Sequence, residues 1–170
     1  MKQVISELSF QTSGEGFIDI TASINDWILE NKVIQGILVI STKHTSCSLI
    51  INENADPNVL ADLSSYMKAL VPEEGYRPIS GRDHSYRYLH SEEGADDMPA
   101  HIRTALTCSC LSLSITERKL LLGTWQAIYL WEHRQSYFSR KISLHAIGEI
   151  SENPKSSSKE IIHSWKDTVT

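Results

Sequence analysis

The residues best equipped for chemistry lie in one segment near the middle of the 170-residue chain, YLHSEEGADDMPAHIR at positions 88–103. Two histidines, His90 and His101, flank a run of carboxylates that ends in Asp97. Histidine nitrogens and carboxylate oxygens bind divalent metals, and the same groups exchange protons near neutral pH. The segment therefore predicts a metal site or an acid–base site. The alternative is a polar loop followed by an ordinary capped helix.

The same segment also carries a signal for the start of a helix. Asp97 is a favoured N-cap residue type, and Pro99 suits a first turn because its missing N–H has no helical partner there. A helix that begins near Met98 would place His101 on its first turn, while His90 would lie on the loop that leads to the helix. We therefore expect the two histidines and the cap to converge on one point.

Two further groups of polar residues lie at the ends of predicted strands. The first contains Lys43, His44, Thr45 and Ser46, with Asn52 and Glu53 at the end of the next strand; the second contains Gly123–Gln126 and Glu132–Arg134. Strand ends present side chains to clefts, so we predict that His44 joins the two histidines of the central segment. As alternatives, Thr45 and Ser46 would satisfy turn amides, and the Glu132–Arg134 group would form a solvated rim.

Hydrophobic patterning predicts the elements that would position these groups. Strands are expected at 4–10, from 16, at 36–42, 46–53, 111–116, 120–133 and 141–148, and helices at 21–31, at 57–70 and from 98. The link at 43–45 would be a tight hairpin, with a kinked continuous strand as the alternative, and 72–87 would be a long loop. This order predicts an α+β single domain with a mixed or antiparallel sheet at 1–150, followed by a polar tail at 151–170.

Composition narrows the classes of protein to which the chain can belong. The net charge is −5, which argues against a nucleic-acid binder held by phosphate contacts. No apolar run approaches the about 20 residues that span a bilayer, and the N-terminus lacks the pattern of a signal peptide, so we expect a cytoplasmic protein without membrane contact. The cysteines at 47, 108 and 110 are expected to be buried small hydrophobes. A Cys47–His44 nucleophile pair is the alternative for the first of them.

Three motifs in this order carry a resemblance: KHTSCSLIINENADP, YLHSEEGADDMPAHIR and LLLGTWQAIYLWEHR. Over about residues 3–150 the chain resembles the YjbQ-type family, also called the secondary thiamine-phosphate synthase family. The resemblance implies an α+β domain that assembles as a homotrimer with its site near the subunit boundaries. It also implies a weak thiamine-phosphate synthase activity, in which a thiazole phosphate attacks hydroxymethylpyrimidine pyrophosphate and expels pyrophosphate. The loop at 75–87 is longer than is usual for that family.

If the chain performs this reaction, the polar residues named above would have the following roles. The catalytic residues would be His101, Glu53, Asp97 and Gln126; the substrate and phosphate contacts would be Lys43, Thr45, Ser46, Asn52 and Arg134; and the metal ligands would be His44, His90 and His101. The cofactor would be a divalent metal, zinc or magnesium, and the partner a small phosphorylated substrate. Three histidines suit zinc better than magnesium. The alternatives are therefore a metal-dependent hydrolase or lyase, or a non-catalytic binding protein for a small phosphorylated compound.

Overall fold

The computed structural model describes residues 1–79, 84–151 and 162–163. Its strands are β1 (Lys2–Ser13), β2 (Gly16–Asp19), β3 (Val33–Thr42), β4 (Cys47–Glu53), β5 (Cys110–Thr116), β6 (Lys119–Leu120), β7 (Gln126–Glu132), β8 (Tyr137–Ile150) and β9 (Ile162–His163). Its helices are α1 (Thr21–Glu30), α2 (Pro57–Leu70) and α3 (Asp97–Leu106). The predicted α+β class is confirmed. Most of the tail predicted at 151–170 lies outside the described residues.

The strands form two sheets, one of six strands in the order β6-β5-β3-β8-β1-β9 and one of three in the order β2-β7-β4. Apart from the parallel contact between β1 and β9, the pairings are antiparallel. In the large sheet, β1 pairs with β8 from Lys2↔Gly148 to Ser13↔Tyr137. The last long strand therefore begins at Tyr137 rather than at the predicted residue 141, because β1 offers it a full-length partner.

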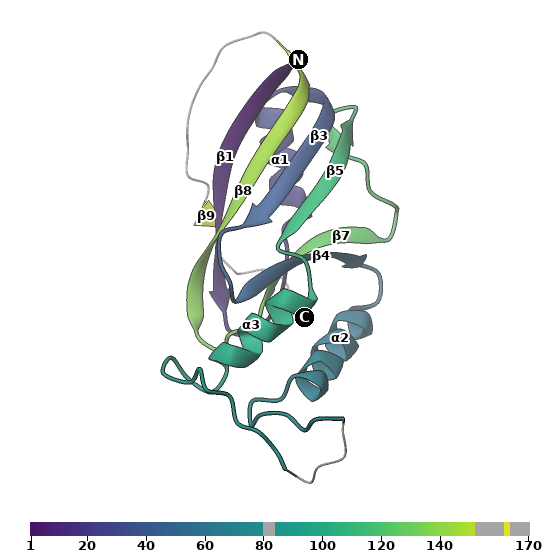
Figure 1. The fold of residues 1–170 in the computed structure, drawn as a ribbon. Coiled ribbons are helices and arrows are strands. Elements are labelled where there is room, and N and C mark those ends of the chain that lie inside the picture. The colour runs from purple at the N-terminus through teal and green to yellow at the C-terminus, as the bar shows by residue number, and fades with distance from the viewer. Residues whose placement is uncertain (80–83, 152–161, 164–170) are drawn as a thin grey trace.

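The hydrophobic core lies between the large sheet, the small sheet and helix α1, which packs behind the large sheet in Figure 1. Alternate residues of β3 and β8 point inward, among them Leu38 and Leu144, and α1 contributes Ile24 and Ile28. All four side chains are buried. Burying an aliphatic side chain of this size contributes roughly 1.5–3 kcal/mol, so the alternation of each strand decides which face turns inward.

The short link between β3 and β4 does not form the predicted hairpin. β3 belongs to the large sheet and β4 to the small one, where β4 pairs with β7. The chain therefore crosses from one sheet to the other at residues 43–46, because successive residues of β4, Cys47 to Leu49, are buried and need cover on both faces. The strand predicted at 120–133 also divides into β6 and β7, with Gly123 in the turn between them.

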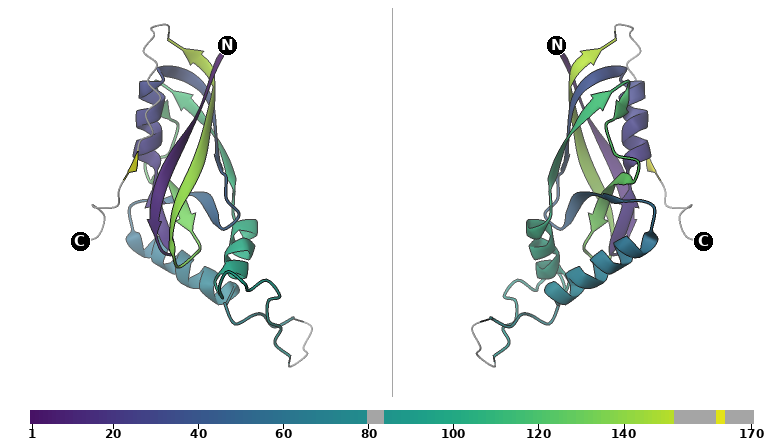
Figure 2. Two further views of the ribbon diagram at one scale, coloured as in Figure 1. Left: turned by 90° about the vertical axis from the view of Figure 1, so that its left-hand side faces the viewer. Right: turned by 90° about the vertical axis from the view of Figure 1, so that its right-hand side faces the viewer.

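Helices α2 and α3 lie at one end of the domain, and the chain between them extends beyond it (Figure 1; Figure 2). α2 begins as predicted, because the Asp56 carboxylate accepts a hydrogen bond of 2.9 Å from the Asn58 N–H. α1 begins at Thr21, as predicted, although its N-cap residue is Ile20, whose side chain makes no cap bond.

Two expectations from composition can be compared with the structure. Cys47 is buried, whereas Cys108 and Cys110 are exposed, so the expectation of three buried cysteines was wrong for the latter two. Cys110 opens β5 at an exposed position, and Cys108 precedes that strand in an isolated bridge with Leu49. Among the described residues, no helix combines the length and the apolar character that crossing a membrane requires.

Candidate metal centre

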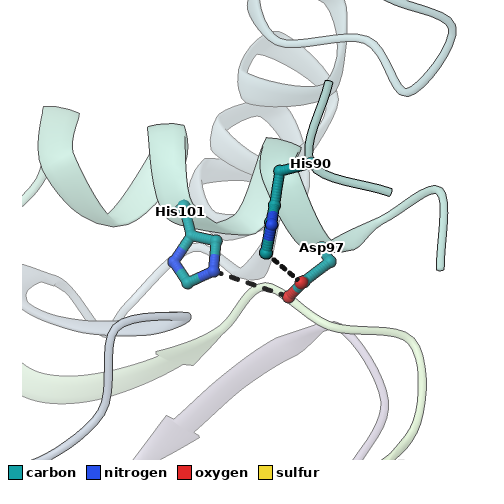
Figure 3. Close-up of side chains that lie close together, drawn as sticks. All are labelled: His90, Asp97 and His101. Carbon is teal, nitrogen blue, oxygen red and sulfur yellow. Dashed lines mark ion pairs between the residues drawn. The ribbon is translucent and has the colours of Figure 1, made fainter. Parts of the chain in front are cut away.

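The start of helix α3 positions two of the functional side chains. α3 begins at Asp97, one residue earlier than predicted, and its N-cap residue is Asp96, whose side chain makes no cap bond. The expectation that Asp97 caps the helix was therefore wrong, because its carboxylate is buried and turned toward other partners. Asp97 and His101 are four residues apart and thus share one face of the helix. His90 reaches the same face from the preceding loop (Figure 3).

These three residues, His90, Asp97 and His101, are the metal centre discussed below. One ligand atom from each lies within 4.8 Å of the other two. The His90 Nε2 is 2.8 Å from the Asp97 Oδ2, and the His101 Nε2 is 3.7 Å from the Asp97 Oδ1. The Asp97 side chain is 3% exposed, whereas those of His90 and His101 are 51% and 32% exposed. The cluster therefore has a buried carboxylate at its base and two imidazoles at an accessible rim.

The Asp97 Oδ2 is a buried oxygen without a well-aligned hydrogen bond, although the His90 Nε2 lies close to it. A buried carboxylate oxygen is costly unless a donor or a cation compensates it. The lone pairs of both imidazoles can be directed to the same place. The arrangement thus fits a bound cation better than an isolated carboxylate.

The tautomer of His101 follows from its contact with the chain before β4. The His101 Nδ1 lies 2.9 Å from the Thr45 carbonyl oxygen. Because a carbonyl oxygen only accepts, Nδ1 carries the proton and donates it, which leaves the lone pair on Nε2. That lone pair faces the side of Asp97. Metal-ligating histidines in proteins are held in this way by a bond from their other ring nitrogen.

Arg134 lies behind Asp97 with its guanidinium fully engaged. It donates from Nε to the Asp96 carboxylate at 3.0 Å, from Nη2 to the Glu93 carbonyl at 2.8 Å, and from Nη1 to the Asp97 carboxylate. Its side chain is 8% exposed. The predicted contact of Arg134 with a substrate phosphate stays a prediction, because the guanidinium serves here to hold the two carboxylates.

The local charges leave an excess of negative charge at the centre. Asp96, Asp97 and the more distant carboxylate of Glu93, at 3.8 Å, surround the single guanidinium of Arg134. Burial acts to raise the pKa of Asp96, but hydrogen bonds from the Gln135 N–H and from Arg134 outweigh it and hold that pKa below its usual value. Three carboxylates and one guanidinium leave two negative charges, which a divalent cation would balance.

The structure does not bring His44 or Lys43 to the metal centre. The His44 Nε2 accepts a hydrogen bond of 2.8 Å from the Lys141 N–H, and burial followed by the Arg140 charge lowers the pKa of His44. Lys43 forms an ion pair of 2.8 Å with Glu7. Asp97 therefore takes the place that we predicted for His44 beside the two histidines. A Lys43 contact with phosphate stays a prediction.

Cys47 does not support the alternative of a Cys–His nucleophile pair. Its thiol contacts the Thr42 hydroxyl at 3.1 Å, and burial raises its pKa. A buried thiol with a raised pKa forms little thiolate, which is the reactive species. The His44 Nε2 is not available to the thiol, because it accepts a hydrogen bond from the backbone N–H of Lys141.

Asn52, Glu53 and Gln126 gather at the other end of β4. They line a pocket of about 470 Å³ that we call the β4 pocket; its lining residues are Ile51, Asn52, Glu53, Ala55, Trp125 and Gln126. The seven residues of β4 separate this pocket from Thr45, which is about 20 Å at the usual rise of a strand. The predicted site residues therefore form two separate groups within one chain.

A buried polar network lies beside the metal centre, and sequence reasoning missed two of its members, Arg140 and Ser48. Glu132, His133 and Arg134 are buried, so the alternative of a solvated rim for this group was wrong. Arg140 makes two hydrogen bonds of 2.6 Å with Glu132, and its Nη2 also donates to the Ser46 hydroxyl at 3.1 Å. Close by, Ser48 and His133 are 2.8 Å apart and fully buried. The alternating pattern of β8 could have predicted that Arg140 is buried, because it places Arg140 on the same face of the strand as the buried Ile142.

The family model described as UPF0047 protein YjbQ-like matches residues 6–149. The UPF0047 protein sll1880 of Synechocystis is 43% identical over 143 residues, covering 84% of this chain and 90% of that protein. The UPF0047 protein YjbQ of Escherichia coli O157:H7 is 35% identical, covering 84% and 96%. A crystal structure of an uncharacterised YjbQ/UPF0047 family protein from Clostridium acetobutylicum is 34% identical, covers 84% of this chain and 99% of its own, and superposes with a TM-score of 0.70.

These relatives correct the expected activity. Their names state no reaction, and thiamine-phosphate synthase belongs to a different fold and family. The expectation that this chain is a thiamine-phosphate synthase, and hence a transferase of that kind, was therefore wrong. The three sequence motifs identify a family, but they do not identify a reaction. By the extent of the family match and the identity to its relatives, the chain belongs to the YjbQ-like UPF0047 family.

Proposed function

We propose that the protein is a metal-dependent enzyme whose centre, formed by His90, Asp97 and His101, binds one divalent ion and activates a water molecule. The observation that carries this proposal is the convergence of three ligand atoms within 4.8 Å on a buried carboxylate oxygen that has no aligned hydrogen bond. The His90 Nε2 is 2.8 Å from that oxygen but makes no aligned hydrogen bond to it, and a buried oxygen in this state favours a cation beside it.

The donor set favours a zinc-type ion over magnesium. Two imidazole nitrogens and one carboxylate oxygen suit zinc and its neighbours, whereas magnesium prefers an all-oxygen shell. In a tetrahedral site with bonds of about 2.0 Å, neighbouring ligand atoms lie about 3.3 Å apart. The His90 Nε2 lies 2.8 Å from the Asp97 Oδ2, somewhat below that spacing, and the three ligand atoms all lie within 4.8 Å of one another. Small rotations of the side chains are therefore enough to close the site.

Three protein ligands leave a coordination position open toward solvent. Open sites of this composition are the catalytic type, in which the bound ion lowers the pKa of a water to about 7. The accessible rim formed by the two histidines lets a small substrate reach that position, while the Thr45 carbonyl and Arg134 hold His101 and Asp97 in place. This chemistry favours the addition of water to an ester, amide or phosphoester bond.

The proposal includes the homotrimer that the family resemblance implies, with the site completed by a second copy. Within one chain the β4 pocket and the metal centre lie at opposite ends of β4. Bringing the pocket of one copy to the centre of the next would place Glu53 and Gln126 beside the open coordination position. An exposed apolar sheet face and a helix α2 without buried residues support self-association.

The metal is tested first, by metal analysis of untagged protein and by titration of metal-free protein with zinc and with cobalt. We expect one ion per chain. His90→Ala should weaken zinc binding by at least about 100-fold, because it removes one of three ligands. The matched control is His145→Ala, since His145 is a histidine on the outer face of the large sheet that contacts Gln3 and lies outside the metal centre.

The reaction is tested with the same proteins on a panel of small esters, amides and phosphoesters. Turnover should require the ion, disappear with a chelator and return with zinc, and His90→Ala should abolish it. The metal proposal is wrong if untagged protein binds no ion, or if His90→Ala and His145→Ala bind zinc equally. Binding of an ion without turnover of any substrate would support a non-catalytic metalloprotein and contradict the enzyme.

A further inference from the structure

The buried network beside the metal centre connects to the two groups that hold metal ligands in place. These groups are Arg134, which bonds Asp97, and the Thr45 carbonyl, which bonds His101. At its base is the bidentate pair of Arg140 and Glu132, whose side chains are 4% and 1% exposed. Thr12 donates a further bond of 2.9 Å to the Glu132 carboxylate, and the Arg140 guanidinium lies 4.3 Å from the ring centre of Phe138. These contacts leave the pair little freedom to move, so whatever is bonded to it is held at a defined position.

One branch of the network leads to Asp97. The Glu132 Oε1 accepts a hydrogen bond of 3.0 Å from the backbone N–H of Arg134. This bond fixes the turn from which the Arg134 side chain extends. Arg134 in turn holds the Asp97 Oδ1, which directs the Asp97 Oδ2 toward His90.

The other branch leads to His101. The Arg140 Nη2 donates to the Ser46 hydroxyl at 3.1 Å, at the point where the chain enters β4. The residue before Ser46 is Thr45, whose carbonyl accepts the bond from the His101 Nδ1 at 2.9 Å. The orientation of Ser46 thus sets the direction of the carbonyl that selects the tautomer of His101.

We propose that the Glu132–Arg140 pair is a positioning device that sets the separation and orientation of Asp97 and His101, and with them the affinity for the ion. The proposal rests on the metal centre proposed above. A buried ion pair adds little net stability, because desolvation offsets its attraction, so its value here lies in geometry. Groups that orient metal ligands without touching the ion change metal affinity by 10–100-fold when they are removed.

The chain offers a matched pair of variants for the test. Ser46→Ala removes the bond from Arg140, while Ser48→Ala, two residues along, removes a buried bond to the His133 imidazole and leaves the bonds of the Glu132–Arg140 pair in place. We expect Ser46→Ala to weaken zinc and cobalt binding by about tenfold. Ser48→Ala should stay within about twofold of the unmodified protein. Equal affinities of the two variants, in folded protein that binds metal, would overturn the positioning role.

A second measurement on the metal-free protein separates this proposal from the metal centre itself. The ¹⁵N chemical shifts of the imidazoles report the tautomer directly. We expect His101 to be predominantly protonated on Nδ1 in the unmodified protein and in Ser48→Ala, and to populate both tautomers in Ser46→Ala. If the protein binds no ion but the tautomer of His101 still differs between Ser46→Ala and Ser48→Ala, the metal centre is refuted and the positioning role of the network is not. An unchanged tautomer in Ser46→Ala refutes the positioning device, whatever the protein binds.

Discussion

At the scale of single residues, His133 shows how burial decides the state of a titratable group. Its Nε2 is bonded to the Ser48 hydroxyl, and its ring lies 4.8 Å from that of Trp131. Burial, followed by the charges of Arg103 and Arg140, lowers the pKa of His133 to about 3. The imidazole is therefore neutral in the folded protein across the physiological range, although it would titrate near pH 6.5 in the unfolded chain.

This shift predicts how stability depends on pH. A histidine with a lowered pKa in the folded state contributes stability that is present above about pH 6.5 and is lost as the pH falls toward 3, because the unfolded chain binds the extra proton. Between pH 7.5 and 5.0 the loss from His133 should be about 2 kcal/mol. The lowered pKa of His44 acts in the same direction.

Urea unfolding at the two pH values tests this. His133→Gln should lose about 2 kcal/mol less between pH 7.5 and 5.0 than the unmodified protein, since glutamine does not titrate. Parallel losses in His133→Gln and in the unmodified protein would show that His133 is not the group responsible.

At the scale of elements, helix α2 depends on its first turn more than on its packing. None of its 14 residues is buried. The Asp56 carboxylate accepts from the Asn58 backbone N–H at 2.9 Å and from its side-chain amide at 2.8 Å. Pro57 occupies the first helical position, where no N–H is needed. The start of α2 is thus stabilised locally, by residues that are neighbours in the sequence.

Removing this cap should have a moderate and specific effect. Asp56→Ala is expected to lower the free energy of unfolding by about 1 kcal/mol, because it leaves the Asn58 N–H without its acceptor. Asp62→Ala, at an exposed position within the same helix, should change it by less than about 0.5 kcal/mol. Chemical denaturation of both variants provides the comparison, and equal effects would contradict a capping role for Asp56.

For the molecule as a whole, the outer face of the large sheet carries exposed isoleucines on three adjacent strands, β1, β8 and β3. Ile37 and Ile147 are direct partners on β3 and β8, and they are 54% and 38% exposed. Ile5 on β1 is 62% exposed, and small polar residues such as Ser112 and Ser114 lie on β5 beside this face. Polar residues separate these isoleucines in part, since the direct partner of Ile5 is His145, but exposed apolar side chains on adjacent strands still favour an interaction surface.

We therefore expect that this face takes part in the proposed homotrimer. Ile37→Lys places a charge in the centre of the face and should convert the assembly to monomers, because burying an unpaired ammonium group is costly. Leu121→Lys, at another exposed apolar position outside the two sheets, should leave the assembly intact. Light scattering coupled to size-exclusion chromatography measures both. An Ile37→Lys protein with the unmodified mass would exclude this face from the interface.

Features that depend on neighbouring residues could be predicted from the sequence. The start of α2 at Asp56–Pro57, the α+β class and the proximity of His90 to His101 all follow from signals within about a dozen residues. Caps, periodicity and short spacings are local, so they can be read without knowing which distant strands pair. The three motifs likewise sufficed to identify the family, although not its reaction.

The contacts between groups that are distant in the sequence could not be predicted and follow from the fold. The crossing from β3 to β4 placed the two strands in different sheets, turned His44 toward Lys141, and separated Glu53 from the metal centre. Arg134 met Asp97 across 37 residues of sequence. Such contacts depend on which strands pair and which side chains are buried, and the spacing of residues along the chain predicts neither. That is why Asp97, expected to cap a helix, stands instead between two histidines and an arginine.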